Sequence, residues 1–281
     1  MFVALPIAYS LFLLLVETVL GLNYIQIAAS TLNMLRWIVI PLSVAGVFLV
    51  VLTRRFGLWG RAIRDEVRAG GWALTIPILL LAVELMAIPY GVFGRLGATY
   101  VLTAAISVAI VGFNEELIFR GVLLIGLRER TTERWAFLWS TLAFGAAHGV
   151  NFLTGLPWWV TLLQMCTAFL TGSVLYMARR ATGSIAASMA LHALWDFWAF
   201  MIQGAVFAGL LSQASQSVAP LAAVGVMIVL AAVTIVAVLS GAVPGPATVS
   251  EGATADDVAP HGRESDQPGP EGPAAGGDSD E

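Results

Sequence analysis

Long apolar stretches recur along the chain, and short segments that contain most of the charged residues separate them. A helix needs ~20 residues to cross a bilayer, and most of these stretches approach or exceed that length. The apolar windows lie at residues 2–22, 34–52, 72–90, 98–127, 135–153, 158–178, 183–207 and 218–239. The pattern predicts an all-α fold, namely a polytopic transmembrane helix bundle of about eight spans.

The segment at residues 53–68, between the second and third windows, is too charged to cross the membrane. It contains five arginines, together with Asp65 and Glu66. Its polar and apolar positions are spaced like those of a helix that lies in the head-group layer. We therefore expect this segment to be interfacial.

Composition supports the membrane class and separates the body of the chain from its end. Hydrophobic residues make up 58% of the chain, charged residues 11%, and the mean hydropathy is +0.85. From residue 240 onward the sequence is rich in Gly, Pro, Ala and acidic residues, which cannot bury enough apolar surface to fold. The sequence predicts one helical domain at residues 1–239 and a disordered acidic tail at 240–281. The single cysteine, Cys166, excludes an intramolecular disulfide.

The arginines indicate an orientation, because basic residues close to span ends stay on the cytoplasmic side. They concentrate in the segments after the second, fourth and sixth windows, while the alternate segments contain few. This distribution predicts a multi-pass protein of the cell membrane with both termini in the cytoplasm.

Three ionisable residues interrupt the fourth window: Glu115, Glu116 and Arg120. Charged groups at this depth cost several kcal/mol even with snorkelling and local water, so they are usually retained for function. A spacing of four places Glu116 and Arg120 on one helix face, whereas Glu115 points about 100° away. We expect Glu116 to pair with Arg120, which leaves Glu115 free to face something else.

Further polar residues lie inside other windows, namely His148, His192 and Asp196, and the last two share a helix face. Glu115, His148 and His192 lie 13, 14 and 12 residues from the arginines that mark the cytoplasmic ends of their spans. At 1.5 Å per residue, all three lie ~18–21 Å from that surface. Such agreement predicts that three helices bring their polar groups to one pocket in the bundle interior, and we expect this pocket to open toward the cytoplasmic leaflet.

Other notable residues have simpler interpretations. Glu17, Glu84 and Arg95 lie singly or close to span ends, so we interpret them as structural. Phe144 is expected to pack the helix face of His148 against a neighbour.

The residue types suit peptide hydrolysis, which requires a base for water, donors for the oxyanion and an acid for the leaving amine. Glu115 suits the base, and the two imidazoles suit the donor roles. Glutamate and two histidines are also ligand types for Zn²⁺, with Asp196 nearby. The ligands would come from three helices, so their spacing does not decide between the two arrangements.

The ordered motifs resemble those of the CPBP intramembrane proteases, a family that includes the CAAX prenyl endopeptidases. The match consists of Glu-Glu-x-x-x-Arg at Glu115 to Arg120, Phe-x-x-x-His at Phe144 to His148, and His-x-x-x-Asn/Asp at His192 to Asp196. It covers roughly residues 106–198. The last position is Asn in the prenyl endopeptidases and Asp in some prokaryotic relatives.

The resemblance implies an endopeptidase that acts on a membrane-associated or lipidated peptide. The sequence contains no groove-reading motif, so we expect no nucleic-acid partner. The resemblance assigns water activation to Glu115 and the rest of the site to His148, His192 and Asp196. The family is classified as metalloproteases, with zinc the expected metal, while a metal-free glutamate mechanism has also been argued. Two alternatives from other classes are a proton-coupled transporter and a non-catalytic immunity or scaffold protein of the membrane.

Overall fold

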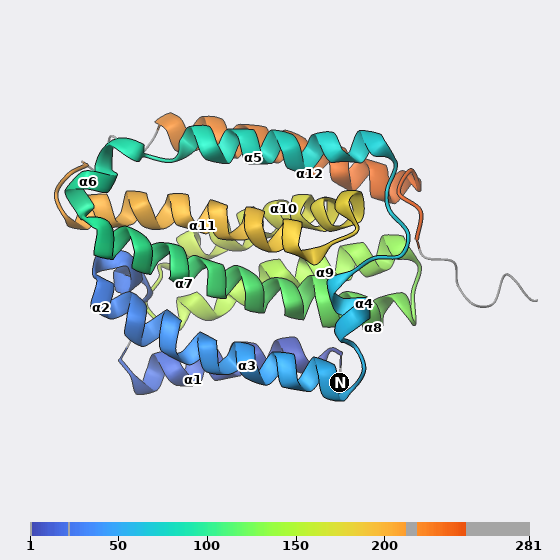
Figure 1. Cartoon of the computed structure of the whole chain (residues 1–281), viewed down its shortest axis with the longest axis horizontal. Coiled ribbons are helices and arrows are strands. Elements are labelled where there is room, and N and C mark those ends of the chain that lie inside the picture. The colour runs from blue at the N-terminus through green and yellow to red at the C-terminus, as the bar shows by residue number, and fades with distance from the viewer. Residues whose placement is uncertain (1, 22, 212–217, 246–281) are drawn as a thin grey trace, which may run out of the picture. The chain divides into compact units, whose positions relative to one another are not determined.

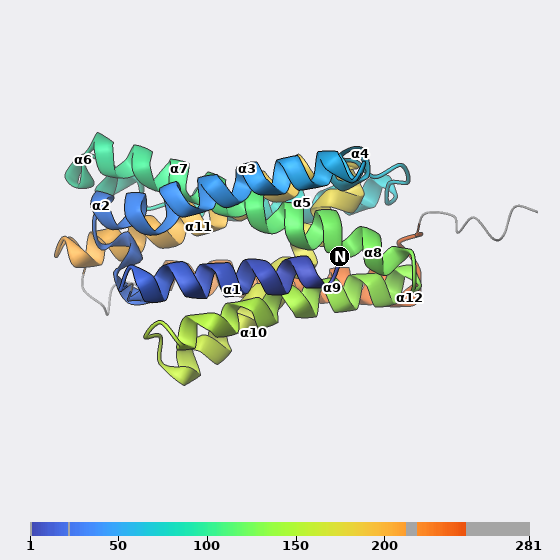
Figure 2. The same cartoon turned by 90° about the horizontal axis from the view of Figure 1, so that it is seen from below.

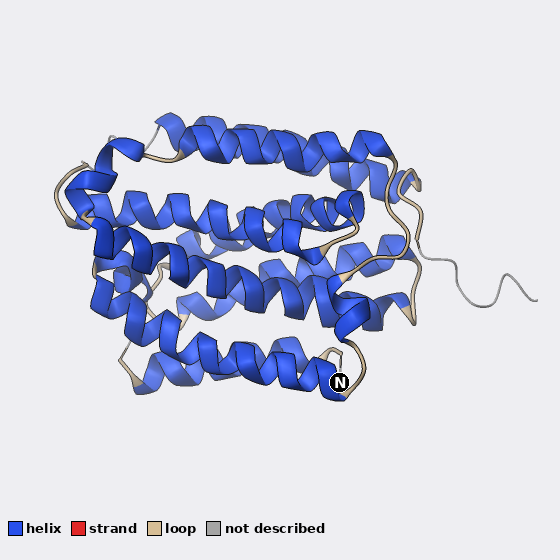
Figure 3. Cartoon of the chain, viewed as in Figure 1, coloured by secondary structure: helices blue, strands red, loops and turns tan. Residues whose placement is uncertain are grey.

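The computed structural model describes residues 2–21, 23–211 and 218–245, and this part of the chain contains helices and loops but no β-strand (Figure 3). The longer helices are α1 (Ala4–Val19), α3 (Ile40–Arg55), α5 (Thr75–Ala87), α7 (Ala98–Glu116), α9 (Glu133–Ala147), α10 (Trp158–Thr182), α11 (Ile185–Phe207) and α12 (Val218–Ser240). The short helices are α2 (Thr31–Met34), α4 (Trp59–Ile63), α6 (Phe93–Leu96) and α8 (Leu124–Arg128). The remaining helical segments are 3-10 turns at Tyr24–Ala29, Gly71–Leu74, Tyr90–Val92 and His148–Phe152, and π-helical turns at Leu35–Val39 and Leu117–Leu123. The all-α fold is confirmed.

Each of the eight apolar windows is mainly helical, and continuous helical segments form where short helices follow one another. Within the described residues, six segments are long and apolar enough to span a membrane: Thr31–Arg55, Gly71–Leu96, Ala98–Arg128, Trp158–Thr182, Ile185–Phe207 and Ala222–Ser240. The helices of the first and fifth windows are shorter, with 16 residues in α1 and 15 in α9. At 1.5 Å per residue, 16 residues extend about 24 Å, less than the ~30 Å hydrocarbon core.

The long helices run side by side along one common direction (Figures 1 and 2). Helices α7 and α11 pack closely against each other, as do α9 and α10, while α5 and α12 pair along another side of the bundle. Helix α1 contacts α9 and the π-helical turn that follows α7. Large apolar side chains such as Leu11 in α1 and Val47 in α3 remain exposed, as expected of surfaces that face lipid tails.

One end of the bundle contains most of the arginines and is called the arginine-rich end below; α3 ends there at Arg55, α8 at Arg128 and α10 at Thr182. Helices α4 and α8 lie at this end in Figure 1, whereas α2 and α6 lie at the other. At its centre, the Asp65 carboxylate is 3% exposed and pairs with Arg128, Arg179 and Arg180 at 2.7–3.0 Å.

The predicted interfacial helix at residues 53–68 is mostly absent. Helix α3 continues to Arg55 and α4 covers only Trp59–Ile63. The chain then runs extended, with the amide of Asp65 donating to the Gly183 carbonyl and that of Ala69 donating to the Arg180 carbonyl. The buried arginines explain the difference, because this path brings Asp65 inward to neutralise them.

The chain divides into units at residues 1–246 and 247–281. Helix α12 ends at Ser240, and the description ends at residue 245. The predicted disordered tail therefore lies almost wholly outside the described residues, and its disorder stays a prediction.

Candidate active site

The Glu115 region changes helix type at the two carboxylates. Helix α7 ends at Glu116, and Leu117–Leu123 form a π-helical turn before α8. Such turns alter the backbone hydrogen-bond pattern and often occur at functional sites. Here the Leu124 amide donates to the Gly121 carbonyl, while the Arg120 carbonyl accepts from Nη1 of Arg179. Arg179 is fully buried and also bonds to Asp65, so the arginine-rich end supports the local geometry of the carboxylate segment.

Glu116 lies between two basic groups. Its Oε1 accepts a hydrogen bond from Nη1 of Arg120 at 2.7 Å and lies 3.1 Å from Nδ1 of His192. Glu116 is 0% exposed and Arg120 only 1%. The expected pairing of Glu116 with Arg120 is present, and the additional contact fixes the His192 ring from α11.

Two other carboxylates face the opposite nitrogen of His192. Its Nε2 lies 3.6 Å from Oδ2 of Asp196, one helical turn away, and 3.9 Å from Oε2 of Glu115. Glu115 is directed away from the Glu116–Arg120 pair, as its helical position predicts. A protonated His192 could donate from both ring nitrogens, since Nδ1 faces Glu116 and Nε2 faces the other two acids.

His148 comes from the end of α9, where it begins the 3-10 turn. Its Nδ1 donates to the Phe144 carbonyl at 2.9 Å. A carbonyl can only accept, so Nδ1 carries a proton and Nε2 of the neutral ring is left as an acceptor. The Phe144 ring is 2% exposed and meets both imidazoles edge to face, with centroids 5.1 Å from His148 and 5.5 Å from His192. The Arg120 guanidinium lies 4.0 Å from the centre of the same ring, so Phe144 packs at the centre of the site.

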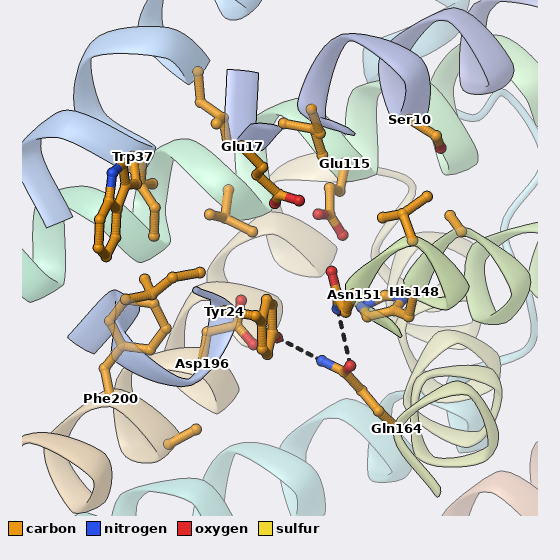
Figure 4. A pocket seen from close by; sticks show the side chains of 18 of the residues that line it. Ser10, Glu17, Tyr24, Trp37, Glu115, His148, Asn151, Gln164, Asp196 and Phe200 are labelled. Carbon is orange, nitrogen blue, oxygen red and sulfur yellow. Dashed lines mark hydrogen bonds between the residues drawn. The ribbon is translucent and has the colours of Figure 1, made fainter. Parts of the chain in front are cut away.

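Four of the six sequence-predicted residues line one cavity of about 360 Å³: Glu115, His148, His192 and Asp196. Glu116 and Arg120 do not line the cavity. Glu116 contacts His192, which does line it, and Arg120 pairs with Glu116. Figure 4 shows Glu115, His148 and Asp196 around this space. The structure thus brings together the polar groups of α7, α9 and α11, as their common depth predicts.

The cavity extends away from the arginine-rich end. Its lining includes Tyr24 and Asn151, from turns at the opposite end of the bundle, and Gln203 near the end of α11. Gln164 connects two of these residues, since its Nε2 donates to the Tyr24 hydroxyl at 2.6 Å and its Oε1 accepts from Asn151 at 2.9 Å (Figure 4). We expected the pocket to open toward the arginine-rich, cytoplasmic leaflet. The cavity instead extends toward the opposite end of the bundle. His148 follows the end of α9 that is remote from the arginines, so the cavity continues into the turns beyond His148.

Helix α1 contributes to the cavity, which the sequence reasoning missed. Tyr9, Ser10 and Glu17 all line it, and Figure 4 shows Glu17 directed into the same space as Glu115. We interpreted Glu17 as structural because it stands alone near a span end. An ionisable residue within an apolar helix was itself the available signal.

The side chains do not form an evident metal centre. Among the described residues, no group of three or more His, Cys, Asp or Glu side chains is placed to hold a metal ion. Both imidazoles contact other groups through Nδ1, His148 with a carbonyl and His192 with Glu116, and these contacts leave Nε2 of each ring available as a ligand. The predicted zinc ligands Glu115, His148 and His192 line the same cavity, and zinc binding by them stays a prediction.

Residues 97–198 match the family model described as type II CAAX prenyl endopeptidase Rce1-like. The match begins at the start of α7 and ends just after Asp196, so it contains all six predicted site residues. No curated protein and no solved structure gives a significant match to this chain.

Proposed function

This chain is a CAAX-protease-like member of the CPBP family, and from that premise we propose that it hydrolyses a peptide bond in a membrane-associated or lipidated peptide. The observation that carries the proposal is the single cavity lined by Glu115, His148, His192 and Asp196. It combines a carboxylate free to act as a base with two imidazoles, inside a multi-pass helical membrane protein.

In the proposed reaction, Glu115 accepts a proton from a water molecule, and the water oxygen bonds to the carbonyl carbon of the substrate. His192 donates from Nε2 to the developing oxyanion, because Glu116 holds its Nδ1 and the ring can carry a positive charge. The carbon–nitrogen bond then breaks, and the proton held by Glu115 passes to the leaving amine. His148 orients the water by accepting a hydrogen bond at Nε2, since its Nδ1 is committed to Phe144.

Asp196 and Arg120 act as positioning residues in this proposal. Asp196 flanks His192 Nε2 at 3.6 Å and favours its charged form. Arg120 neutralises Glu116 and lies over the Phe144 ring, so it fixes two neighbours of the imidazoles. We place both termini in the cytoplasm, because basic residues close to span ends stay on the cytoplasmic side and most of the arginines lie at one end of the bundle.

Cleavage can be tested with purified protein in lipid nanodiscs and a library of lipidated and membrane-anchored peptides. Wild type is compared with Glu115→Gln, His148→Ala and His192→Ala. Loss of the proton acceptor in Glu115→Gln is expected to lower kcat by at least ~100-fold, the scale of general acid–base catalysis. Equal cleavage by wild type and Glu115→Gln would remove Glu115 from the proposed mechanism.

Zinc stays a prediction that the same preparation can test. Metal content is measured for wild type and for His148→Ala, and cleavage is measured with and without a chelator. One zinc per chain that is lost in the variant would support the metalloprotease mechanism. Full cleavage by metal-free protein would support the glutamate mechanism described above.

A further inference from the structure

The cavity is lined by three carboxylates and by no Lys or Arg. Glu17 comes from α1, Glu115 from α7 and Asp196 from α11. The nearest arginine of the site, Arg120, is outside the lining and paired with Glu116 at 2.7 Å. The cavity is therefore surrounded by an excess of acidic groups.

The two histidines cannot balance these acids. His192 contacts Glu115 and Asp196, and one imidazolium offsets at most one of them. His148 donates from Nδ1 to a carbonyl and is neutral in the mechanism proposed above. Glu17 makes no ion pair within the described part of the chain, so it is the acid left without a counter-charge.

Two buried polar atoms on α1 also lack partners. Glu17 is 9% exposed and Tyr9 is 6% exposed, and both line the cavity. Neither Oε2 of Glu17 nor the Tyr9 hydroxyl has a hydrogen-bond partner in the described residues. A buried polar group without a partner costs free energy, so a bound molecule that supplies donors here would gain the corresponding interaction.

The shape and walls of the cavity favour an organic cation over a metal ion. Among the described residues, no group of three or more His, Cys, Asp or Glu side chains is placed to hold a metal ion, whereas a cavity of about 360 Å³ falls within the ~300–1,000 Å³ range of small-molecule sites. Tyr24, Trp37 and Phe200 line the same space and offer aromatic faces, which attract ammonium and guanidinium groups (Figure 4).

We infer that this cavity selects substrates with a lysine or arginine side chain next to the scissile bond, and that Glu17 holds the cationic group. The inference rests on the proposed peptidase function, because the same cavity contains Glu115. It identifies Glu17 as a specificity-determining residue that neutralises charge on the substrate and takes no part in bond cleavage.

The test uses N-acetylated, lipid-anchored peptides that differ at one position near the cleaved bond, with lysine, norleucine or glutamate there. Norleucine keeps the apolar chain of lysine and removes the amine. Wild type, Glu17→Gln and a surface control, Glu66→Gln, are assayed in nanodiscs for both binding and cleavage. Glu66 is exposed, so the control removes one acidic charge away from the cavity.

We expect wild type to cleave the lysine peptide with a kcat/KM about tenfold above that of the norleucine peptide, and the glutamate peptide most slowly. Glu17→Gln should lower kcat/KM for the lysine peptide more than for the norleucine peptide, so that the lysine advantage is lost, whereas Glu66→Gln should keep that advantage. Equal cleavage of the lysine and norleucine peptides by wild type would overturn the inference, even if Glu17→Gln failed to fold. So would a Glu17→Gln variant that lowers both rates equally.

The binding arm separates this inference from the proposed function. Stronger binding of the lysine peptide without cleavage of any peptide would reject the peptidase and keep the cation site. Cleavage of the peptides without a preference for lysine would reject the cation site and keep the proposed peptidase function.

Discussion

At the residue scale, the neighbouring carboxylates Glu115 and Glu116 have different surroundings. Glu116 is fully buried and contacts Arg120 and His192, whereas the Glu115 side chain is 15% exposed and lines the cavity. Loss of one partner from a buried ion pair leaves an uncompensated charge, which typically costs ~3–5 kcal/mol. The two acids should therefore differ in what they contribute to stability and to catalysis.

We predict that Glu116→Gln lowers the thermal stability of the protein, by an amount on the scale of that ~3–5 kcal/mol penalty, because Arg120 loses its counter-charge. Glu115→Gln should unfold within a few degrees of wild type while losing cleavage. Thermal unfolding in nanodiscs, measured beside peptide cleavage, compares the two isosteric variants directly. Similar loss of stability in both would contradict the division of roles.

At the element scale, glycine allows α10 to approach the site closely. A Cβ atom at Gly172 would lie 2.6 Å from Nη2 of Arg120 and 3.0 Å from Cδ1 of Phe144. The guanidinium has little room to move away, because Glu116 and the Phe144 ring hold it on two sides. Close packing at this position thus fixes both residues that support the imidazoles.

Gly172→Ala is therefore expected to lower stability by ~1–3 kcal/mol, the usual cost of overpacking, and to lower kcat/KM as Phe144 shifts. Gly225→Ala in α12 is the matched control, because its Cβ would meet no atom within 4 Å. Alanine is the better helix former, so the control should be neutral or slightly more stable. If Gly172→Ala had the stability and cleavage rate of wild type, the close approach of α10 to Arg120 and Phe144 would not be needed.

At the scale of the whole molecule, Asp65 connects three parts of the arginine-rich end. Its carboxylate bonds to Arg128 at the end of α8 and to Arg179 and Arg180 at the end of α10. Burial alone would raise the pKa of Asp65, but the charges of Arg179 and Arg128 outweigh it and hold that pKa well below its usual range. The ionised carboxylate therefore stabilises the folded state.

The lowered pKa sets the direction of a pH effect. A group with a lowered folded-state pKa contributes its full stability above its unfolded pKa of about 3.9, and that contribution declines progressively as the pH falls from there toward the lower folded-state pKa. Asp65→Asn should lower the thermal stability markedly at pH 7, since Arg179 and Arg180 stay buried. The difference in unfolding temperature between wild type and Asp65→Asn should become smaller as the pH falls from about 5 toward 3.

Glu129→Gln serves as the control for this comparison. Glu129 pairs with Arg61 at 2.9 Å, but both side chains are largely exposed, and such pairs contribute about 0–1 kcal/mol. Its unfolding temperature should stay close to that of wild type across the same pH range. If the difference in unfolding temperature between wild type and Asp65→Asn stayed constant down to pH 3, this result would argue against an ionised Asp65 in the folded state.

Local features of the sequence determined much of this protein. Long apolar stretches require helices in a bilayer, because only internal hydrogen bonds can satisfy the backbone there. The four-residue spacings of Glu116 with Arg120 and of His192 with Asp196 fixed which side chains share a helix face. Common depth then predicted that Glu115, His148 and His192 would meet.

Only the tertiary structure decided what surrounds these groups. Contacts between helices depend on their rotation and order in the bundle, which periodicity along one helix does not encode. Packing of α1 against the site brought Glu17 into the cavity, and the path of the chain after α4 brought Asp65 to the buried arginines. The cavity lies toward the end opposite those arginines because α9 ends at Ala147, so the turn that begins at His148 forms its wall.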